Sequence, residues 1–387
     1  MQSFRHIFPA LRLFSGADCL GQLGAELERA GSQRAVLVCG ASIARDEKLI
    51  ELIMRAACGR CVSVCSGVLA HSPLPVVEAV SAELARQEAD AAIAVGGGSA
   101  VVTARAASIL LAEKRDGRSL ATARDPASGR LMSPKLIAPK IPQFVIPTTP
   151  TTATVKAGSA MLDPDNGARL ALFDPKTRAS AVFLHPDFVA SAPHSLVLSA
   201  SLNTTAMTVE ALLSRTGDPF SDGLLLHALG LVVEHLPRFA ASDHPDARAA
   251  LMMASLLTGH ASDYTGAGIA IPLGHAVSAR FHLENGRVNA IVLPHVIRFN
   301  SAASPQGMTH LARVLTPGQP VQVESIVRAT ADLIAQAGTT RRLRDLGVDH
   351  DALPDIAAVA MDDWFVRDNP RPIRAVSELL EVLEAAW

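Results

Sequence analysis

Three consecutive glycines and a serine form the part of the sequence best suited to binding a phosphate group. An apolar run ending at Ala94 and Val95 predicts a buried strand, residues 96–99 follow it, and a helical pattern begins directly afterwards. Glycine allows the backbone to approach a phosphate, and a helix N-terminus offers unpaired N–H groups and the positive end of a dipole. Linkers and plain turns also contain such glycines, but the place between strand and helix favours phosphate binding.

A second turn carries a row of hydroxyl groups. Residues 143–149 predict another strand, which ends in a threonine-rich turn at 147–152. Threonines in such a place could simply cap a helix. Ligands of parallel sheets bind outside the carboxyl ends of the strands. Two polar turns at strand ends therefore predict a nucleotide-binding site.

Alternating strand and helix patterns position these turns. Strands are predicted at 34–40, 61–67 and 143–149 and in the run 90–100, where the strand leads into the glycine turn, and helices at 44–57, 74–89 and 101–114. This order predicts a parallel sheet. A Pro-Asp-Asn-Gly turn at 164–167 predicts a β-hairpin, and the polar, basic segment 115–142 is interpreted as a surface excursion. From residue 186 only helical spacing continues, so we expect an α/β domain at 1–185 and an all-helical domain at 186–387.

The composition excludes several classes of protein. The 387 residues include 35 Lys and Arg against 37 Asp and Glu, and so lack the basic excess of a nucleic-acid or membrane-surface binder. Aromatic residues make up 4%, which leaves little material for stacking on nucleic-acid bases. The mean hydropathy is +0.26, yet no uninterrupted apolar stretch approaches the roughly 18 residues of a membrane-spanning helix. The N-terminal residues do not resemble a signal peptide, so we expect a cytoplasmic protein.

All five cysteines lie within the first 65 residues. An odd number without a secretory signal indicates reduced thiols. The spacing of Cys58, Cys61 and Cys65 raises the question of a metal or redox site. No fourth thiolate or nearby histidine completes a tetrahedral set, so we interpret the three as packing residues.

Several segments together resemble successive landmarks of the iron-containing (group III) alcohol dehydrogenase family. They are VGGGSAVVTARA, IPTTPTTATV, SASLNTTAMTVEALLS, PLGHAVSARFHLENGRVNAIVLPHVIRFN and the late NPR at 369–371. The resemblance covers essentially the whole chain. It implies a Rossmann-like dinucleotide-binding domain followed by an all-α domain, a dehydroquinate synthase-like architecture, with the active site in the cleft between them. It also implies a homodimer.

The resemblance assigns the nucleotide site residue by residue. Gly97, Gly98 and Ser99 are expected to hold the pyrophosphate. The residues expected to line the rest of the cofactor are Thr148, Thr149, Thr152 and Arg169. Arg169 stands where the family has a lysine, so the positive charge is kept. After the glycine turn, an acidic residue of the family is replaced by Val102 and the following lysine by Arg105.

The expected metal site departs from the family at every position. The family binds its divalent ion with an aspartate and a histidine four residues apart on one helix and two later histidines. These positions hold Asn203, Met207, Ile271 and Asn285. Fe(II) and Zn favour carboxylate and imidazole ligands, which none of these side chains provides. We therefore expect no metal at the family site. A relocated site built from His260, Asp263, His275 and His282 is the weaker alternative.

His275 matches the family's non-ligand histidine beside the nicotinamide. Its expected role is to donate or relay a proton, which suits a side chain that titrates near neutral pH. A packed or surface histidine is the alternative reading, and His282 and Tyr264 are the reserve candidates.

The end of the first predicted strand bears on the choice between NADP and NAD. Folds that select NAD place an acidic side chain against the ribose 2′-hydroxyl, whereas this chain has Gly40 there. Without that carboxylate a 2′-phosphate meets no repulsion, although the nearby Arg45 is not an obvious clamp for it. The sequence leans towards NADP(H) and leaves NAD(H) open.

These residues lead to an expected function and two alternatives. We expect an NAD(P)-dependent, metal-independent reductase of a small aldehyde, ketone or oxo-acid, with Asn203 and Asn285 bonded to the carbonyl oxygen. Arg280 and Arg367 are candidate anchors for an acidic substrate. The first alternative is a maleylacetate reductase-like enzyme of aromatic degradation, since those relatives carry an asparagine at position 203. They retain histidines at 207 and 285, however, and lack an insertion like 115–142. The second alternative is a non-catalytic nucleotide-binding relative with a regulatory or assembly role.

Overall fold

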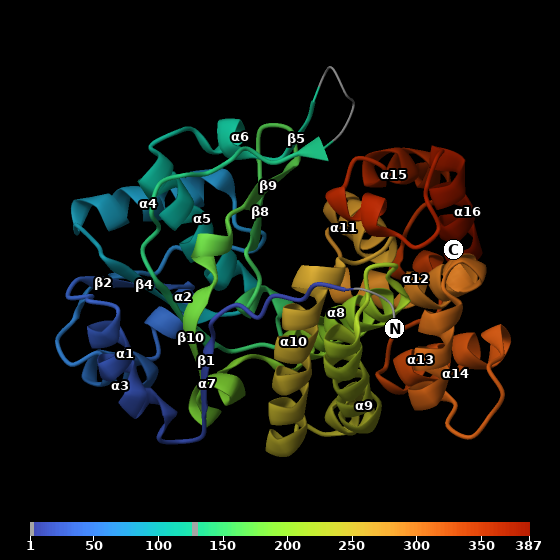
Figure 1. Cartoon of the computed structure of the whole chain (residues 1–387), viewed down its shortest axis with the longest axis horizontal. Coiled ribbons are helices and arrows are strands. Elements are labelled where there is room, and N and C mark those ends of the chain that lie inside the picture. The colour runs from blue at the N-terminus through green and yellow to red at the C-terminus, as the bar shows by residue number, and fades with distance from the viewer. Residues whose placement is uncertain (1–3, 126–130) are drawn as a thin grey trace. The chain divides into compact units, whose positions relative to one another are not determined.

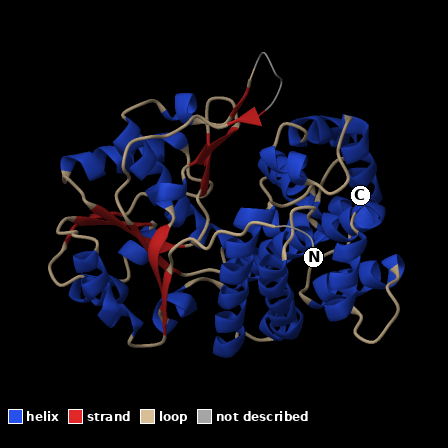
Figure 2. Ribbon diagram, in the orientation of Figure 1, coloured by secondary structure: helices blue, strands red, loops and turns tan. Residues whose placement is uncertain are grey.

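The computed structural model describes residues 4–125 and 131–387, and their contacts divide the chain into two compact units. One unit is Phe8–Ala192, and the other combines residues 4–7 with Pro193–Trp387. The first contains all the strands and the second is helical (Figures 1 and 2). The expected α/β and all-α fold class is confirmed. Each unit is described separately below.

The first unit is built on a six-stranded parallel sheet in the order β1-β10-β7-β4-β2-β3. Its strands are β1 (Arg12–Ser15), β2 (Ala35–Cys39), β3 (Cys61–Cys65), β4 (Ala91–Gly96), β7 (Gln143–Pro147) and β10 (Ala179–Leu184). The chain passes from β2 outward to β3 and returns to place β4 on the other side of β2. This change of direction leaves a crevice at the carboxyl ends of β2 and β4, where open α/β sheets bind ligands.

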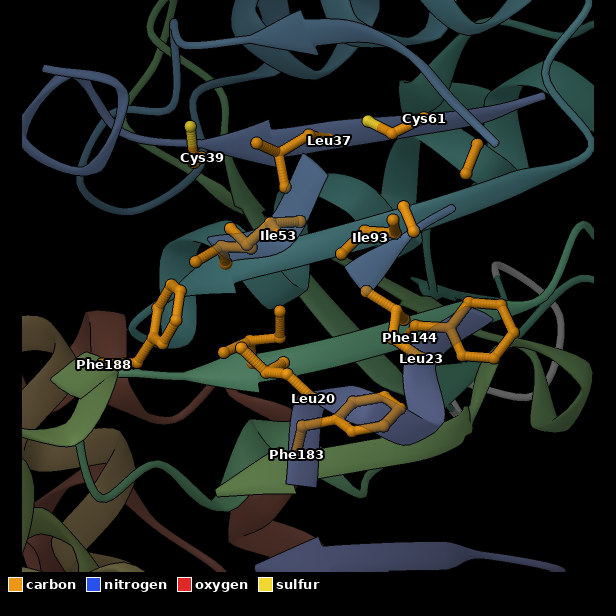
Figure 3. Close-up of a cluster of buried hydrophobic side chains, with 14 of the residues drawn as sticks. Leu20, Leu23, Leu37, Cys39, Ile53, Cys61, Ile93, Phe144, Phe183 and Phe188 are labelled. Carbon is orange, nitrogen blue, oxygen red and sulfur yellow. The ribbon is translucent and has the colours of Figure 1, made fainter. Parts of the chain in front are cut away.

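Helices connect and cover these strands. They are α1 (Leu23–Arg29), α2 (Ala41–Ala44), α3 (Glu47–Ala56), α4 (Leu74–Arg86), α5 (Gly98–Glu113), α6 (Gly117–Leu120) and α7 (Pro186–Ser191). Single turns of 3₁₀ helix lie at η1 (Cys19–Gln22), η2 (Thr152–Thr154) and η3 (Pro175–Thr177). Figure 3 shows the core on one face of the sheet, where Leu37, Ile93 and Phe144 of the strands meet Leu23 and Ile53 of the helices. The central strands β2, β4 and β7 are buried along their length, which explains their continuous apolar runs, whereas the edge strands β1 and β3 are partly exposed.

The cysteines take part in this core to different extents. Cys19, Cys39 and Cys61 belong to the buried cluster, as the packing interpretation predicts. Burial raises the pKa of the Cys39 thiol to about 11 and, with Glu83 nearby, that of Cys65 to about 11. Cys58 departs from the interpretation because it is exposed. All five are free thiols.

Two small antiparallel hairpins flank the main sheet. β8 (Gly158–Leu162) pairs with β9 (Arg169–Phe173) across the predicted turn, where Gly167 has φ +72°. β5 (Ala123–Arg124) pairs with β6 (Leu131–Met132) inside the segment 115–142, of which residues 126–130 lie outside the described part. The surface interpretation of that segment is wrong at Lys140. Its fully buried ammonium lies 2.6 Å from Glu113 and 3.1 Å from Asp174 and holds the pKa of Glu113 below its ordinary value.

The second unit is made of helices. They are α8 (His194–Leu213), α9 (Pro219–Ala241), α10 (Pro245–Thr265), α11 (Ala270–Phe281), α12 (Asn285–Asn300), α13 (Pro305–Leu315), α14 (Val323–Gln336), α15 (Leu353–Ala360) and α16 (Val376–Ala386). Short 3₁₀ turns are η4 (Ser301–Ala303), η5 (Leu343–Leu346), η6 (His350–Ala352) and η7 (Trp364–Asp368). By length and composition alone α8 and α9 could each cross a membrane, but 78% of the apolar window of α8 is buried inside the structure. α8 packs against α9, α10, α11, α12 and α13 and is the central helix of the unit.

Residues 4–7 attach to the helical unit through His6. The His6 ring is 3% exposed, its Nδ1 lies 3.0 Å from Oδ2 of Asp218, and it stacks on Tyr264 at 4.6 Å between centroids. Asp218 also caps α9 by accepting from the backbone N–H groups of Phe220 and Ser221. This N-terminal segment is therefore a fixed part of the helical unit.

Candidate active site

The glycine turn lies where β4 ends and α5 begins. Gly96 has φ +141°, a conformation that glycine adopts without strain, and Gly97 is the N-cap of α5. No side chain caps this helix end, so its first N–H groups remain available to a ligand. The sequence thus places a phosphate-binding geometry at the carboxyl end of β4.

The threonine turn lies directly beside the glycine turn. The backbone N–H of Thr148 donates to the Gly96 carbonyl oxygen at 3.0 Å. A Cβ added at Gly97 would lie 2.9 Å from Oγ1 of Thr149, so a larger residue has little room there. At Gly98 the nearest hydroxyl belongs to Thr151, which the sequence reasoning did not select. Thr152, which it did select, is buried at the start of η2. The structure brings the two predicted turns together.

Gly40 lies at the carboxyl end of β2, where the strand order changes direction. It follows β2 directly, and the adjacent Cys39 is paired with Val95 of β4, so Gly40 lies next to the glycine turn. Gly40 has φ −83° and a Cβ there would lie 3.6 Å from the Val68 carbonyl oxygen, an ordinary contact. The position can therefore accept a side chain. Arg45 points back to its own helix, with Nε donating to Ala41 at 3.1 Å.

Ser99 and Arg169 adjoin a loop that the sequence did not single out. Ser72 is buried, and its hydroxyl donates to the Ser99 carbonyl oxygen at 3.1 Å. His71 and Ser72 both have positive φ, 62° and 50°, a conformation that costs energy for non-glycine residues. Arg169 begins β9, and burial together with the Arg169 charge holds the pKa of His71 below its ordinary value. Arg169 thus contributes positive charge near this loop.

Arg105 has a structural role in the middle of α5. Its side chain is 0% exposed and its guanidinium donates to the carbonyl oxygens of Thr177, Gly158 and Ala153 at 3.3, 2.7 and 2.7 Å. These contacts tie α5 to η2, β8 and η3. Arg105 therefore serves in this chain to fix the end of the threonine turn.

The residues that the sequence resemblance assigns to the metal positions lie on three mutually packed helices. Asn203 and Met207 are one turn apart on α8, Ile271 lies on α11, and Asn285 begins α12. Met207 and Ile271 are buried, while Asn203 and Asn285 are partly exposed. Within residues 4–125 and 131–387, no group of three or more His, Cys, Asp or Glu side chains could hold a metal ion.

Asn289, which the sequence reasoning missed, joins these helices. Its Nδ2 lies 2.7 Å from Oδ1 of Asn203. With the Asn289 amide turned by half a rotation, its nitrogen reaches the carbonyl oxygens of Ala270 and Asn285 at 3.2 Å, and its oxygen faces Asn203. Gly274 of α11 admits this amide, since an added Cβ would lie 1.5 Å from Oδ1 of Asn289. The amide of Asn203 is thus engaged within the protein.

Within the described ranges 4–125 and 131–387, the candidates for a relocated metal site form no group that could hold a metal ion. His260 lies near His6, at 6.3 Å between ring centroids. His282 is exposed at the left-handed C-cap of α11, and Tyr264 stacks on His6. His275 is held elsewhere, as described next.

His275 contacts a carboxylate that lies far from it in sequence. Its Nδ1 is 2.9 Å from Oδ2 of Asp363, and the two side chains are 12% and 8% exposed. His275 lies on α11, whose N-terminal backbone N–H at Ala270 donates to Glu210 of α8 at 2.6 Å. Burial raises the pKa of Glu210 to about 7. Two acidic side chains thus fix the helix that carries His275.

The arginines proposed as substrate anchors are already close to acidic side chains. Arg280 Nη1 donates to Asp355 at 3.1 Å, and Arg367 Nε lies 3.4 Å from Asp368. Arg280, Asp355 and Arg367 are exposed at the protein surface.

Comparison with known proteins identifies the class of protein. Family models described as "Iron-containing alcohol dehydrogenase" and "Fe-containing alcohol dehydrogenase family, C-terminal" match residues 10–186 and 198–387. The chain belongs to the iron-containing alcohol dehydrogenase family, as the sequence resemblance implied. It is an enzyme of the alcohol dehydrogenase or reductase type.

Three individual proteins illustrate the similarity. The lactaldehyde reductase of Escherichia coli strain K12 is 26% identical over 383 residues, which cover 96% of this chain and 97% of the relative. The crystal structure of a 1,3-propanediol oxidoreductase shares the fold with a TM-score of 0.89, 22% identity and full coverage of both chains. The maleylacetate reductase of Agrobacterium tumefaciens shares it with a TM-score of 0.80 and 22% identity, over 100% of this chain and 99% of that one.

Proposed function

We propose that this protein transfers hydride between a nicotinamide dinucleotide and a small aldehyde, ketone or oxo-acid without a metal ion. The proposal is carried by the residue types that the resemblance places at the four metal positions, which are Asn203, Met207, Ile271 and Asn285. A carboxamide, a thioether and an alkyl group do not supply the carboxylate or imidazole that Fe(II) or Zn requires. The hydrogen bond between Asn203 and Asn289 further supports a protein-filled site.

The first unit fits a dinucleotide. Gly97, at the uncapped start of α5, and Gly98 leave no room for side chains beside the threonine hydroxyls. The pyrophosphate would lie against the N–H groups of this turn, with Thr148 and Thr149 beside it and Arg169 supplying positive charge. Gly40 leaves the ribose 2′ position without a carboxylate, which favours NADP(H).

The chemistry then depends on a proton donor in the helical unit. The reduced nicotinamide supplies the hydride to the carbonyl carbon. His275 gives the proton to the carbonyl oxygen, so that the products are an alcohol and the oxidised dinucleotide. Asn285 and Asn203 are proposed to bond the same oxygen, with Asn203 rearranging its contact to Asn289.

Metal removal is the direct test of this function. After dialysis against EDTA, the protein is expected to oxidise NADPH or NADH with at least one member of a panel of small aldehydes and oxo-acids, at an unchanged rate. Absorbance at the nicotinamide band measures the reaction, and metal analysis verifies that the sample is metal-free. Activity that returns only with Fe(II) or Zn would contradict metal independence. Binding of NAD(P)H without turnover on any carbonyl would instead support the non-catalytic alternative.

A maleylacetate reductase-like activity is the second candidate. The asparagine at position 203 and the shared fold support it. Including maleylacetate in the same panel separates the two, since a rate at least about tenfold above those of simple aldehydes would favour this candidate. We also propose a homodimer, to be measured by sedimentation equilibrium.

Cofactor preference is expected to reverse on substitution of Gly40. Gly40→Asp places a carboxylate at the carboxyl end of β2, where it would repel a 2′-phosphate and accept a hydrogen bond from a 2′-hydroxyl. Neither the φ of −83° nor the Val68 contact obstructs the side chain. The ratio of kcat/KM for NADPH to that for NADH should fall by about tenfold or more, equivalent to about 1.4 kcal/mol.

The matched control adds the same charge elsewhere in the unit. Gly21 in η1 is exposed and has nothing within 4 Å of an added Cβ, so Gly21→Asp should leave the ratio unchanged. An unchanged ratio of kcat/KM for NADPH to that for NADH in Gly40→Asp would show that position 40 does not determine the choice between a ribose 2′-phosphate and a 2′-hydroxyl.

A further inference from the structure

The contact between His275 and Asp363 has the geometry of a proton-transfer dyad. The Nδ1 to Oδ2 distance is 2.9 Å, and 88 residues separate the two side chains in sequence. Both are largely shielded from water, so the contact is screened less than a surface ion pair. Because an ionised carboxylate only accepts hydrogen bonds, Nδ1 must carry the proton. The Nε2 atom is then the nitrogen that can exchange a proton with a substrate.

The carboxylate itself is held in place. Asp363 is the N-cap of η7, and its Oδ1 accepts from the Phe365 backbone N–H at 3.1 Å. One oxygen therefore fixes the side chain and the other faces the ring. The helix that carries the ring is held separately, since Glu210 of α8 accepts from the first backbone N–H of α11. The ring and its carboxylate thus belong to two elements that are each anchored separately.

We propose that Asp363 is a positioning residue that holds His275 in the tautomer and charge state needed to protonate the carbonyl oxygen. This rests on the proposed function. The negative charge favours the protonated ring, and the hydrogen bond directs Nε2 to the reacting atoms. After Nε2 gives its proton to the carbonyl oxygen, the neutral ring keeps the proton on Nδ1 beside Asp363. A proton from water then restores the ring before the next turnover.

The elements packed against α11 also carry other charged groups. Glu210 of α8 is close enough for the Asp363 charge to contribute to its raised pKa, after burial. Asp355, in the first turn of α15, pairs with Arg280. Arg367 of η7 lies near Asp368. On α12, Asn285 and Asn289 are uncharged, and Arg287 lies 3.9 Å from Glu284. Asp362 is the remaining acid next to Asp363 in sequence.

Asp363→Asn tests this role because asparagine keeps an oxygen for the Phe365 cap, while the atom that faces the ring changes from a charged acceptor to an amide NH2. Its kcat/KM for the carbonyl substrate should fall by about 10- to 1,000-fold, within the range for losing general acid catalysis. The high-pH limb of the kcat/KM profile should move to lower pH, because the protonated ring loses its stabilising carboxylate. The Kd of NADPH should stay within about twofold, and Asp363→Glu should recover part of the rate.

The control is Asp246→Asn, which removes the carboxylate of another Asp–His pair, at 3.8 Å from His244 on the exposed start of α10. It should leave the rate and the pH profile unchanged. The proposal is overturned if Asp363→Asn is folded, as judged by thermal unfolding, and its pH profile matches the wild type while His275→Ala is inactive. A lower rate with an unmoved limb and no rescue by glutamate would also overturn it, since it would indicate packing alone. Failure of the proposed function is distinct, because then the wild type itself lacks metal-free turnover.

Discussion

Replacing His275 by alanine is expected to lower kcat for carbonyl reduction by about 100- to 10,000-fold, the usual contribution of a positioned acid or base. The substitution removes the only proton donor assigned to the carbonyl oxygen and leaves the hydride donor in place. The Kd of NADPH should be nearly unchanged, because the glycine and threonine turns belong to the other unit. Steady-state oxidation of NADPH and a fluorescence titration measure the two quantities.

His227→Ala provides the comparison for His275→Ala. His227 is an exposed histidine on α9 and should tolerate the change with the rate unaltered. Nearly full activity in His275→Ala would contradict its role as the proton donor and would make His282 and Tyr264 the next candidates for that role. Loss of NADPH binding together with turnover would point to a folding defect rather than to proton transfer.

The second large effect is expected in stability. Arg105→Met replaces a fully buried guanidinium with an apolar chain of similar length and leaves the carbonyl oxygens of Ala153, Gly158 and Thr177 without this donor. A buried polar group left unpaired costs about 1–3 kcal/mol. Allowing for partial relaxation, the free energy of unfolding should fall by about 3–5 kcal/mol. Urea unfolding followed by circular dichroism measures it.

Two further variants define the cause of that loss. Arg105→Lys keeps the charge, but one ammonium cannot reproduce the fork of a guanidinium, so its stability should lie between those of the wild type and Arg105→Met. Arg55→Met removes an exposed arginine of α3 that pairs with Glu51 at 3.2 Å, and should change stability by less than about 0.5 kcal/mol. If Arg105→Met and Arg55→Met have the same free energy of unfolding, the three carbonyl contacts of Arg105 do not stabilise the protein.

Much of the fold follows from local sequence signals. The glycine turn is recognisable because an apolar strand, three glycines and a helical pattern occupy about twenty consecutive residues. The hairpin of β8 and β9 is recognisable because Pro164 to Gly167 give a turn whose chemistry is set within four residues. Such features need no knowledge of distant neighbours.

The parts that escaped prediction depend on long-range contacts. Asn289 meets Asn203 across 86 residues, and Asp363 meets His275 across 88. Neither contact has a periodic signal, because each joins single polar side chains from segments far apart in the sequence. Lys140 shows the same limit in the opposite direction. Its place in a basic, polar segment predicts a surface lysine. In the structure it is buried, and the carboxylates of Glu113 and Asp174 compensate for the lost hydration by pairing with its ammonium group.

The attachment of residues 4–7 to the helices decides how the chain can be divided. The α/β unit is one continuous piece, Phe8–Ala192, whereas the helical unit is made of two pieces that lie at opposite ends of the sequence. A fragment beginning at Pro193 would lack His6. It would leave the Asp218 carboxylate without its imidazole partner and the face of Tyr264 uncovered. Topologically, the nucleotide-binding unit is an insertion within the helical one, and the helical unit is complete only when both ends of the polypeptide are present.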